Sequence, residues 1–204
     1  LRNDIHITSS SMDKSSAISA AAVRLGITAK VHLKVDTGME RIGVHWYNAE
    51  RFITHALSLP GMEIRGLFSH LAKADSDPGF TEEQIGRFKD IVCFMESQNA
   101  LPELVHLSNS AGIMRYPEAR FTLVRPGIML YGYNPFGLLP DERFHGRKLL
   151  PAMTLKTRVA YFKVCPKDTG ISYNHTHVAN EQTRIVTLPI GYGDGYSRIL
   201  SNKG

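Results

Sequence analysis

The sequence has few of the residues and patterns that mark several large classes of protein. It has two cysteines among 204 residues, Cys93 and Cys165, and neither belongs to a CxxC pair. A disulfide framework or a zinc site is therefore not expected, and a reducing, cytoplasmic compartment fits better. No apolar run approaches the ~20 residues that span a bilayer, and no basic run alternates with aromatics as nucleic-acid binding would favour.

What is present is typical of a globular protein, with 43% hydrophobic and 21% charged residues. The formal charge of +5 is spread along the chain. A small phosphate-bearing ligand could use part of it, although a generally basic surface is the simpler interpretation. The chain opens on Leu1 without a signal-peptide pattern, and its last apolar segment is followed at once by Gly204. We expect an internal segment of a longer protein.

The first two thirds of the chain alternate strand-like and helix-like patterns. Apolar runs predict strands at residues 5–9, 31–35, 64–69, 104–107 and 122–125. Helices are predicted from Met12 to Leu25, from a cap at Asn48 to Leu57, and after a capping box of Thr81 and Gln84. This order indicates parallel strands with helical crossovers, the C-terminal part of a TIM-type (β/α)8 barrel.

The pattern changes near Pro151. Apolar and polar residues alternate from Met153 to Tyr161, another strand is predicted from Arg184 to Ile190, and no long helical pattern separates the two. We place a domain boundary in the polar stretch Asp141 to Lys148. The sequence therefore predicts a partial barrel domain over 1–148 and the beginning of an all-β domain over 149–204.

Polar residues gather where the predicted parallel strands end, which is where barrels place their active sites. Arg41, His70, Asn109–Ser110 and Arg125 each follow a different strand. Any one of them is more often an ordinary surface residue, but together they favour a site. The segment Arg125-Pro126-Gly127-Ile128 could present backbone amides to a phosphate beside the Ser110 hydroxyl, although from spacing alone a tight turn is the better interpretation.

Three other patterns are weaker evidence for a functional site. Gly191 to Gly195 lacks the spacing of a nucleotide-binding loop and lies in the β part. His175 and His177 could share a face as metal ligands, but no third ligand is evident, so no metal site is predicted. Lys34, on a barrel strand, could simply be a partly buried lysine paired with an acid.

At these segments the chain resembles alanine racemases along essentially its whole length. Single pieces are weak signals, but six in the family's order are strong. They are residues 34–43 (KVDTGMERIG), 69–75 (SHLAKAD), 109–111 (NSA), 124–132 (VRPGIMLYG), 170–173 (GISY) and 189–196 (PIGYGDGY).

The resemblance implies a barrel joined to a β domain, pyridoxal 5'-phosphate as cofactor, and a homodimer whose active sites each combine one subunit's barrel with its partner's β domain. It implies interconversion of L-alanine and D-alanine, which supplies D-alanine for peptidoglycan. Two bases act from opposite faces of Cα, and the cofactor delocalises the carbanion between them. In the family the bases are the cofactor lysine and a tyrosine, and Tyr173 matches the tyrosine.

The resemblance also assigns the other site residues. A phenol is a poor base near neutrality unless nearby cations lower its pKa, and His70 and Arg125 match the chain of groups that does this. Arg125 would also face the pyridine nitrogen and limit side reactions. Arg41 matches a contact to the cofactor and to the substrate carboxylate, and Lys34 matches a lysine that is carbamylated in some members and holds that arginine. Phosphate contacts match Ser110, Gly127 and Ile128, and the substrate channel matches Tyr192, Asp75 and Arg198.

Two departures from the family pattern stand out. The family's cofactor lysine lies upstream of Leu1, so this segment alone would lack one base and be inactive. Asn174 replaces the common glycine after the tyrosine; because asparagine tolerates a positive φ, we expect the turn to be kept. Alternatives are a racemase of serine or lysine, a fold-related pyridoxal-phosphate decarboxylase, or a non-enzymatic cofactor-binding barrel, against which the strands after Pro151 argue.

Overall fold

The computed structural model describes residues 3, 5–137 and 149–203, and these form two compact units that divide between Ala152 and Met153. Each unit is described by itself. The sequence-based boundary at residues 141–148 lies outside the described residues, so it stays a prediction. None of the described helices is both long and apolar enough to cross a membrane.

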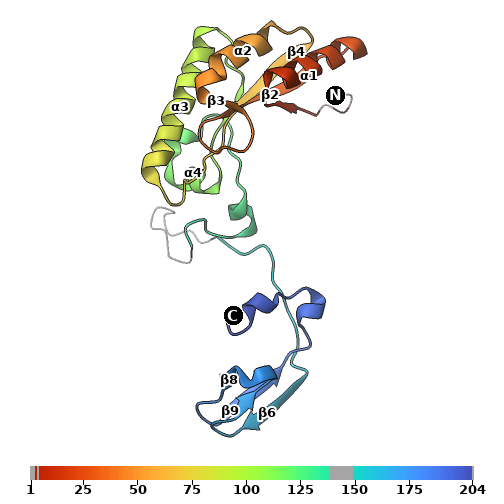
Figure 1. Ribbon diagram of the computed structural model, residues 1–204, viewed down its shortest axis with the longest axis vertical. Helices are drawn as coiled ribbons and strands as arrows, with labels where there is room; N and C mark the ends of the chain where they lie inside the picture. The colour runs from red at the N-terminus through yellow and green to blue at the C-terminus, as the bar shows by residue number, and fades with distance from the viewer. Residues whose placement is uncertain (1–2, 4, 138–148, 204) are drawn as a thin grey trace. The chain divides into compact units, whose positions relative to one another are not determined.

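The first unit is a parallel sheet with helical connections (Figure 1). The chain runs through β1 (Ile7–Ser9), α1 (Met12–Leu25), β2 (Ala29–Asp36), β3 (Val44–His45), α2 (Ala49–Ser58), β4 (Met62–Phe68), α3 (Pro78–Ser97), β5 (Leu104–His106) and α4 (Ser110–Arg115), with the short 3₁₀ turn η1 (Trp46–Asn48) before α2. The strand order is β1-β2-β4-β5, and β3 pairs with the C-terminal end of β2. This is the expected βαβ succession.

The two faces of this sheet carry different side chains because successive strand residues point to opposite sides. One face packs under the helices in a single apolar core that contains Val31, Leu33, Val35, Leu67, Phe52, Phe88 and Met95. On the other face, register pairs Lys34 with Phe68 and Phe68 with His106. His32, Lys34, Phe68 and His106 together are called the polar face below.

Helix ends follow local capping chemistry, with two corrections to the sequence-based predictions. α1 has the predicted bounds: Ser11 accepts a hydrogen bond from the Lys14 amide, and Gly26 ends the helix at φ 63°. The prediction that Thr81 and Gln84 form a capping box is wrong. α3 begins at Pro78, where Asp77 accepts from the Phe80 amide, and this Asp-Pro start precedes Thr81 by a full turn. Asn48 precedes α2, but its side chain makes no capping bond.

The predicted strand at residues 122–125 is also wrong. The amides of Thr122 and Leu123 both donate to the Val105 carbonyl, and the Arg125 amide donates to the Ser108 carbonyl. Two successive amides on one acceptor break the alternation of a ladder, so this segment lies beside β5 without forming a regular strand. It nevertheless brings Arg125 to the C-terminal end of the sheet.

The second unit contains only short strands and turns. β6 (Tyr161–Cys165) pairs with β9 (Thr183–Thr187), and β7 (Gly170–Ile171) pairs with β8 (His177–Val178), both antiparallel. Residues 153–160, predicted as a strand, are not one; apart from the Ala160 amide, which donates to Thr187, the described chain gives them no strand partner. The strand predicted at 184–190 is confirmed only to Thr187.

Candidate functional site

Arg125 is the centre of the polar groups at the C-terminal end of the first unit's sheet. Its guanidinium donates to the carbonyls of Ser69 at 2.6 Å and Leu107 at 3.2 Å, to His70 Nδ1 at 3.3 Å, and to His106 Nδ1. All four acceptors are neutral. Burial lowers the pKa of Arg125 to about 10, which leaves it cationic near neutrality. The site therefore holds a positive charge that none of these contacts neutralises. Such a charge favours the binding of an anionic ligand.

His70 follows β4 and accepts from Arg125 through Nδ1. Burial, followed by the charges of Arg125, Arg41 and Lys34, lowers the pKa of His70 to about 4. The imidazole is therefore neutral at physiological pH. Because Nδ1 accepts a hydrogen bond, Nε2 carries the proton and is a donor.

Lys34 lies on the polar face and is 2% exposed. Its Nζ donates to the Val35 carbonyl at 2.8 Å and lies 5.4 Å from the centre of the Phe68 ring. Burial lowers the pKa of Lys34 to about 8; Asp36 opposes this, and Arg125 and Arg41 add to it. A substantial fraction of this amine is therefore neutral near physiological pH, in contrast to an ordinary surface lysine.

The loop after β2 is built on the carboxylate of Asp36. Asp36 accepts hydrogen bonds from the amides of Gly38 and Met39 at 2.8 Å and of Arg41 at 3.3 Å. Partial burial raises its pKa, but these backbone bonds prevail and lower it. Gly43 then returns the chain against β2 at φ 116°, where a Cβ would lie 3.0 Å from the Lys34 side chain. This tight return places Arg41 next to the site and encloses Lys34.

Ser110 meets the segment after Arg125. Its hydroxyl accepts from the amides of Gly127 at 2.9 Å and Met129 at 3.2 Å. The predicted meeting of this serine with the Pro-Gly turn is thus present in the structure. A hydroxyl and turned-in amides, close to an uncompensated arginine, are groups that a phosphate monoester binds. The residues present therefore fit a phosphorylated, anionic cofactor.

The sequence pattern did not identify Gln84, which is fully buried on α3, as a residue of the site. Its Nε2 donates to the His70 carbonyl at 3.1 Å and to Thr37 Oγ1 at 3.3 Å, and its Oε1 accepts from the Ala72 amide at 2.8 Å. One side chain thus ties the loop that leads to Arg41 to the loop that carries His70. A polar residue on the buried stripe of an amphipathic helix is the signal that could have found it.

Tyr173 lies in the second unit, in the 3₁₀ turn η5 (Tyr173–His175) between β7 and β8, and is 91% exposed. Asn174 has φ 58°, so the expected left-handed turn is confirmed. Ser172 and His175 also have positive φ values, of 61° and 47°. Three non-glycine residues in this region mark a turn of stored backbone strain, a feature that clusters at functional sites.

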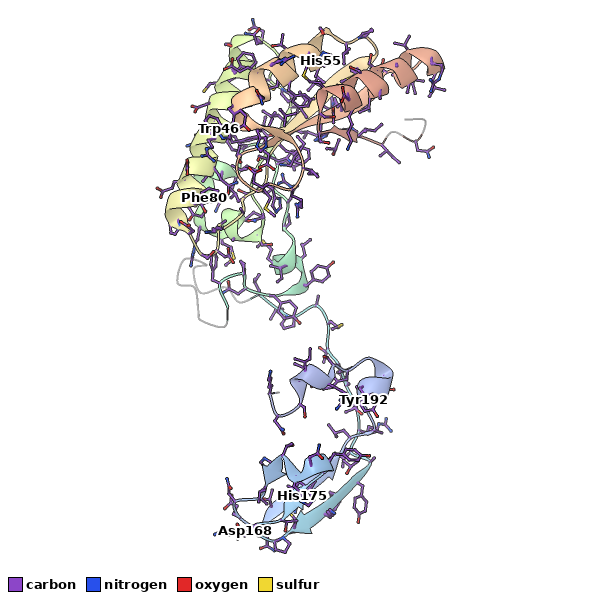
Figure 2. The ribbon with its side chains drawn as sticks, in the orientation of Figure 1. Trp46, His55, Phe80, Asp168, His175 and Tyr192 are labelled. Carbon is purple, nitrogen blue, oxygen red and sulfur yellow. The ribbon has the colours of Figure 1, made fainter. Side chains whose placement is uncertain are left out.

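The residues predicted for the substrate channel lie in both units. Tyr192, labelled in Figure 2, and Arg198 belong to the second. The Arg198 guanidinium lies 5.8 Å from the centre of the Tyr192 ring. Asp75 belongs to the first and is exposed. Its carbonyl accepts from Arg115 at 3.0 Å. The substrate-channel roles of all three residues stay predictions.

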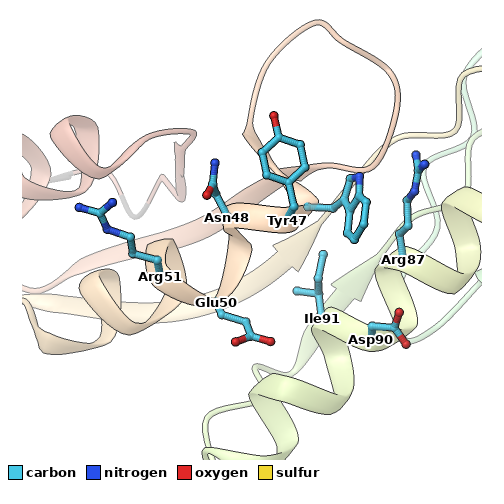
Figure 3. A pocket seen from close by; sticks show the side chains of 8 residues that line it. Tyr47, Asn48, Glu50, Arg51, Arg87, Asp90 and Ile91 are labelled. Atoms are coloured by element: carbon cyan, nitrogen blue, oxygen red, sulfur yellow. The ribbon is translucent and has the colours of Figure 1, made fainter.

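A separate cavity of about 540 Å³ lies on the helical side of the first unit (Figure 3). It is lined by residues of η1, α2 and α3, among them Trp46, Arg87 and Asp90, and by none of the predicted site residues. The Arg87 guanidinium lies 4.9 Å from the centre of the Trp46 ring, and both side chains line the cavity. Within the described part of the chain, no three His, Cys, Asp or Glu residues are grouped as metal ligands would be.

Comparisons with known proteins bear on all these residues together. The family model "Alanine racemase, N-terminal domain" matches residues 1–135, and "Alanine racemase, C-terminal domain" matches residues 152–204. The chain belongs to the alanine racemase family. Its membership confirms the expected fold class, a part of a TIM-type barrel followed by the start of a β domain.

Individual relatives agree. The alanine racemase of Desulfovibrio desulfuricans is 41% identical over 97% of this chain, and that of Carboxydothermus hydrogenoformans is 46% identical over 89%. Among solved structures, an alanine racemase of Clostridium difficile 630 matches 97% of the chain with a TM-score of 0.80 at 34% identity. The chain spans about half the length of these relatives: 53% and 48% of the two curated proteins and 52% of the solved chain.

Proposed function

We propose that this chain is part of a pyridoxal-phosphate-dependent enzyme that interconverts L-alanine and D-alanine, here called the complete protein. The observation that carries the proposal is the half-buried Arg125, whose four described hydrogen bonds go to neutral acceptors, one of them His70, within a chain that matches both family domains. The proposed cellular role is the supply of D-alanine for peptidoglycan in the cytoplasm. All the relatives named above are alanine racemases, which disfavours the decarboxylase alternative.

The proposed roles of the residues follow the family resemblance. Ser110, Gly127 and Ile128 hold the cofactor phosphate. Arg125 would face the cofactor ring and, as a cation that does not readily give up its proton, would leave the ring nitrogen without one. The cofactor supplies the electron sink that acidifies the substrate Cα–H. Arg41 holds the substrate carboxylate, and Tyr192, Asp75 and Arg198 line the substrate channel.

Tyr173 is the proposed base on the L-alanine side. It moves the Cα proton as a general acid–base group. Since Tyr173 and Arg125 belong to different units, we propose that the active site combines the first unit of one subunit with the second unit of its partner in a homodimer. The second base, a lysine, would come from a part of the complete protein outside this chain.

The test is Tyr173→Phe in the complete protein. Loss of one acid–base group is expected to lower alanine racemisation by ~10² or more, while cofactor absorbance and dissociation constant stay unchanged. Tyr161→Phe, an exposed tyrosine of β6 in the same unit, is the matched control and should keep full activity. Near-normal turnover by Tyr173→Phe in both directions would remove Tyr173 from the mechanism. A panel of L-amino acids assayed with the wild type separates alanine from serine and lysine.

A further inference from the structure

We propose that His6, His32 and His106 form a hydrogen-bonded chain in which His32 and His106 are neutral imidazoles with their protons on Nε2, and that this chain positions Arg125. The roles of His70 and Arg125 in the proposed function do not include these three histidines. Only the catalytic consequence of the inference rests on the proposed function; the protonation pattern and the positioning of the guanidinium do not.

The contacts run without a gap from β1 towards the end of β5. His6 Nδ1 lies 3.0 Å from His32 Nε2, and His32 Nδ1 lies 3.0 Å from His106 Nε2. His106 Nδ1 then meets the Arg125 guanidinium. The ring centres are 5.2 Å and 5.3 Å apart. His106 itself is 5% exposed and stacks on Phe68 at 4.8 Å.

Arginine determines where each proton lies. A guanidinium has only donors, so His106 Nδ1 must offer a lone pair, and the single proton of neutral His106 is on Nε2. That proton is donated to His32 Nδ1, which places the proton of His32 on its own Nε2, facing His6 Nδ1. Every nitrogen between Arg125 and His6 thus has one assigned state.

Protonation of a chain member would break the pattern, because two N–H groups would then face each other. The charged groups that act on the inner members are also unfavourable to a further positive charge: Arg65 acts on His32, and Arg125 and Lys34 act on His106. Burial first, then Arg125, His32 and Lys34, lowers the pKa of His106 to about 3. Burial, then His6 and Arg65, lowers the pKa of His32.

The sheet itself is shaped around His32. The residue paired with it on β4 is Gly66, where a Cβ would lie 2.2 Å from His32 Nδ1. The register between β2 and β4 also shifts between Val31 and His32. A glycine and a bulge at the same pair make room for the ring at a cost to the sheet. This points to a role for the ring beyond filling space.

The histidine chain contributes to the position of Arg125 because few other groups hold its guanidinium. Its remaining hydrogen bonds go to two backbone carbonyls and His70, and its guanidinium carbon lies 5.4 Å from the centre of the Phe68 ring. His106 is the side chain that holds NH1, while the other three contacts go to NH2. Removing His106 therefore frees one side of the fork and lets the guanidinium rotate about the other. A displacement of about 1 Å in a catalytic group can cost ~10²-fold in rate.

The experiment compares His106→Leu with His106→Asn in the complete protein. The Asn amide oxygen can accept from Arg125 near the position of Nδ1, whereas Leu cannot. His55→Leu, a partly exposed histidine of α2 bonded to Ser16, is the control. We expect the Nε–H NMR resonance of Arg125 to shift in His106→Leu, to be restored in His106→Asn, and to be unchanged in the control. We expect kcat to fall by 10- to 10²-fold in His106→Leu only.

Nitrogen-15 spectra of histidine in the cofactor-free wild type test the protons directly. Nε2-protonated neutral rings for His32 and His106 from pH 5.5 to 8 are expected. An Nδ1-protonated ring or an imidazolium in that range would overturn the protonation pattern, and an Arg125 resonance unmoved in His106→Leu would overturn the positioning role. If the wild type racemises no amino acid while both NMR results hold, the proposed function fails and the histidine chain stands.

Discussion

At the scale of single residues, Lys34 has the properties needed for a chemical modification. It is buried, and its pKa is lowered to about 8. A neutral amine can react with CO₂, and the resulting carbamate would pair with Arg41 or Arg125. We therefore propose that Lys34 is carbamylated and that the modification holds Arg41.

Removal of bicarbonate from the complete protein should raise the KM for alanine, and its return should reverse the effect. Recovery should be more complete at pH 8.5 than at pH 7, because the neutral fraction of an amine with a pKa near 8 rises with pH. Lys34→Met, which keeps the apolar stem, should have a raised KM that does not respond to bicarbonate. Unchanged kinetics together with a bare amine in the mass spectrum would count against the modification.

Residues of the site differ in how far the sequence could predict them. Arg41, His70, Ser110 and Arg125 were predictable because each lies at the end of a strand-like run or in the loop that follows it, and parallel strands bring such positions to one edge. His32 and His106 lie inside strands, where a histidine resembles any half-buried residue. Their hydrogen bonds span 26 and 74 residues of sequence, so no local pattern could reveal them.

At the scale of elements, the pairing of β2 with β4 depends on Gly66. Gly66→Ala should lower the free energy of unfolding of the complete protein by ~1–3 kcal/mol, because the new methyl group overlaps the His32 ring and must displace it. Gly86→Ala is the matched control, because Gly86 is an exposed residue in the middle of α3 and nothing lies within 4 Å of a new Cβ there. It should gain ~0.5–1 kcal/mol from the better helix former. Urea unfolding measures both; equal effects would show that His32 moves aside freely.

The predictions of helices and strands succeeded where residues next to the apolar pattern decide the structure locally. α1 has both its cap and its terminal glycine next to the apolar pattern, and both were found. The errors are segments whose apolar alternation favours a strand but whose pairing is decided elsewhere in the chain. Residues 122–125 and 153–160 both have that alternation, and neither forms a ladder with the described chain.

At the scale of the whole molecule, the chain leaves strands and apolar groups without partners. β1 and β5 end the strand order of the described sheet: no described strand pairs with the outer edge of β1, and beside β5 lies only the irregular segment 122–125. Leu150, Met153 and Leu155 are 80%, 77% and 64% exposed. Free edges and exposed apolar side chains favour association. We expect the segment to be stable only when the rest of the complete protein or another copy covers these groups.

The segment alone should also fail to bind the cofactor covalently at one position, because no lysine here matches the family's cofactor lysine. Addition of pyridoxal phosphate, reduction with borohydride and peptide mapping should give weak, scattered labelling, with Lys34 and Lys73 as the candidates near the site. Stoichiometric labelling of a single lysine, accompanied by alanine racemisation, would show that the second base is within this chain.

The order β1-β2-β4-β5 repeats the order of these strands along the chain. As the chain is synthesised from its N-terminus, each βα unit can dock on the strand edge left by the one before it. None of these four strands has to be inserted between two that are already paired. His32 is therefore synthesised before Gly66 and His106, and the strand order allows the histidine chain to be assembled in sequence order. Arg125 is synthesised after all three histidines, so its hydrogen-bond acceptors would be present in the chain before it.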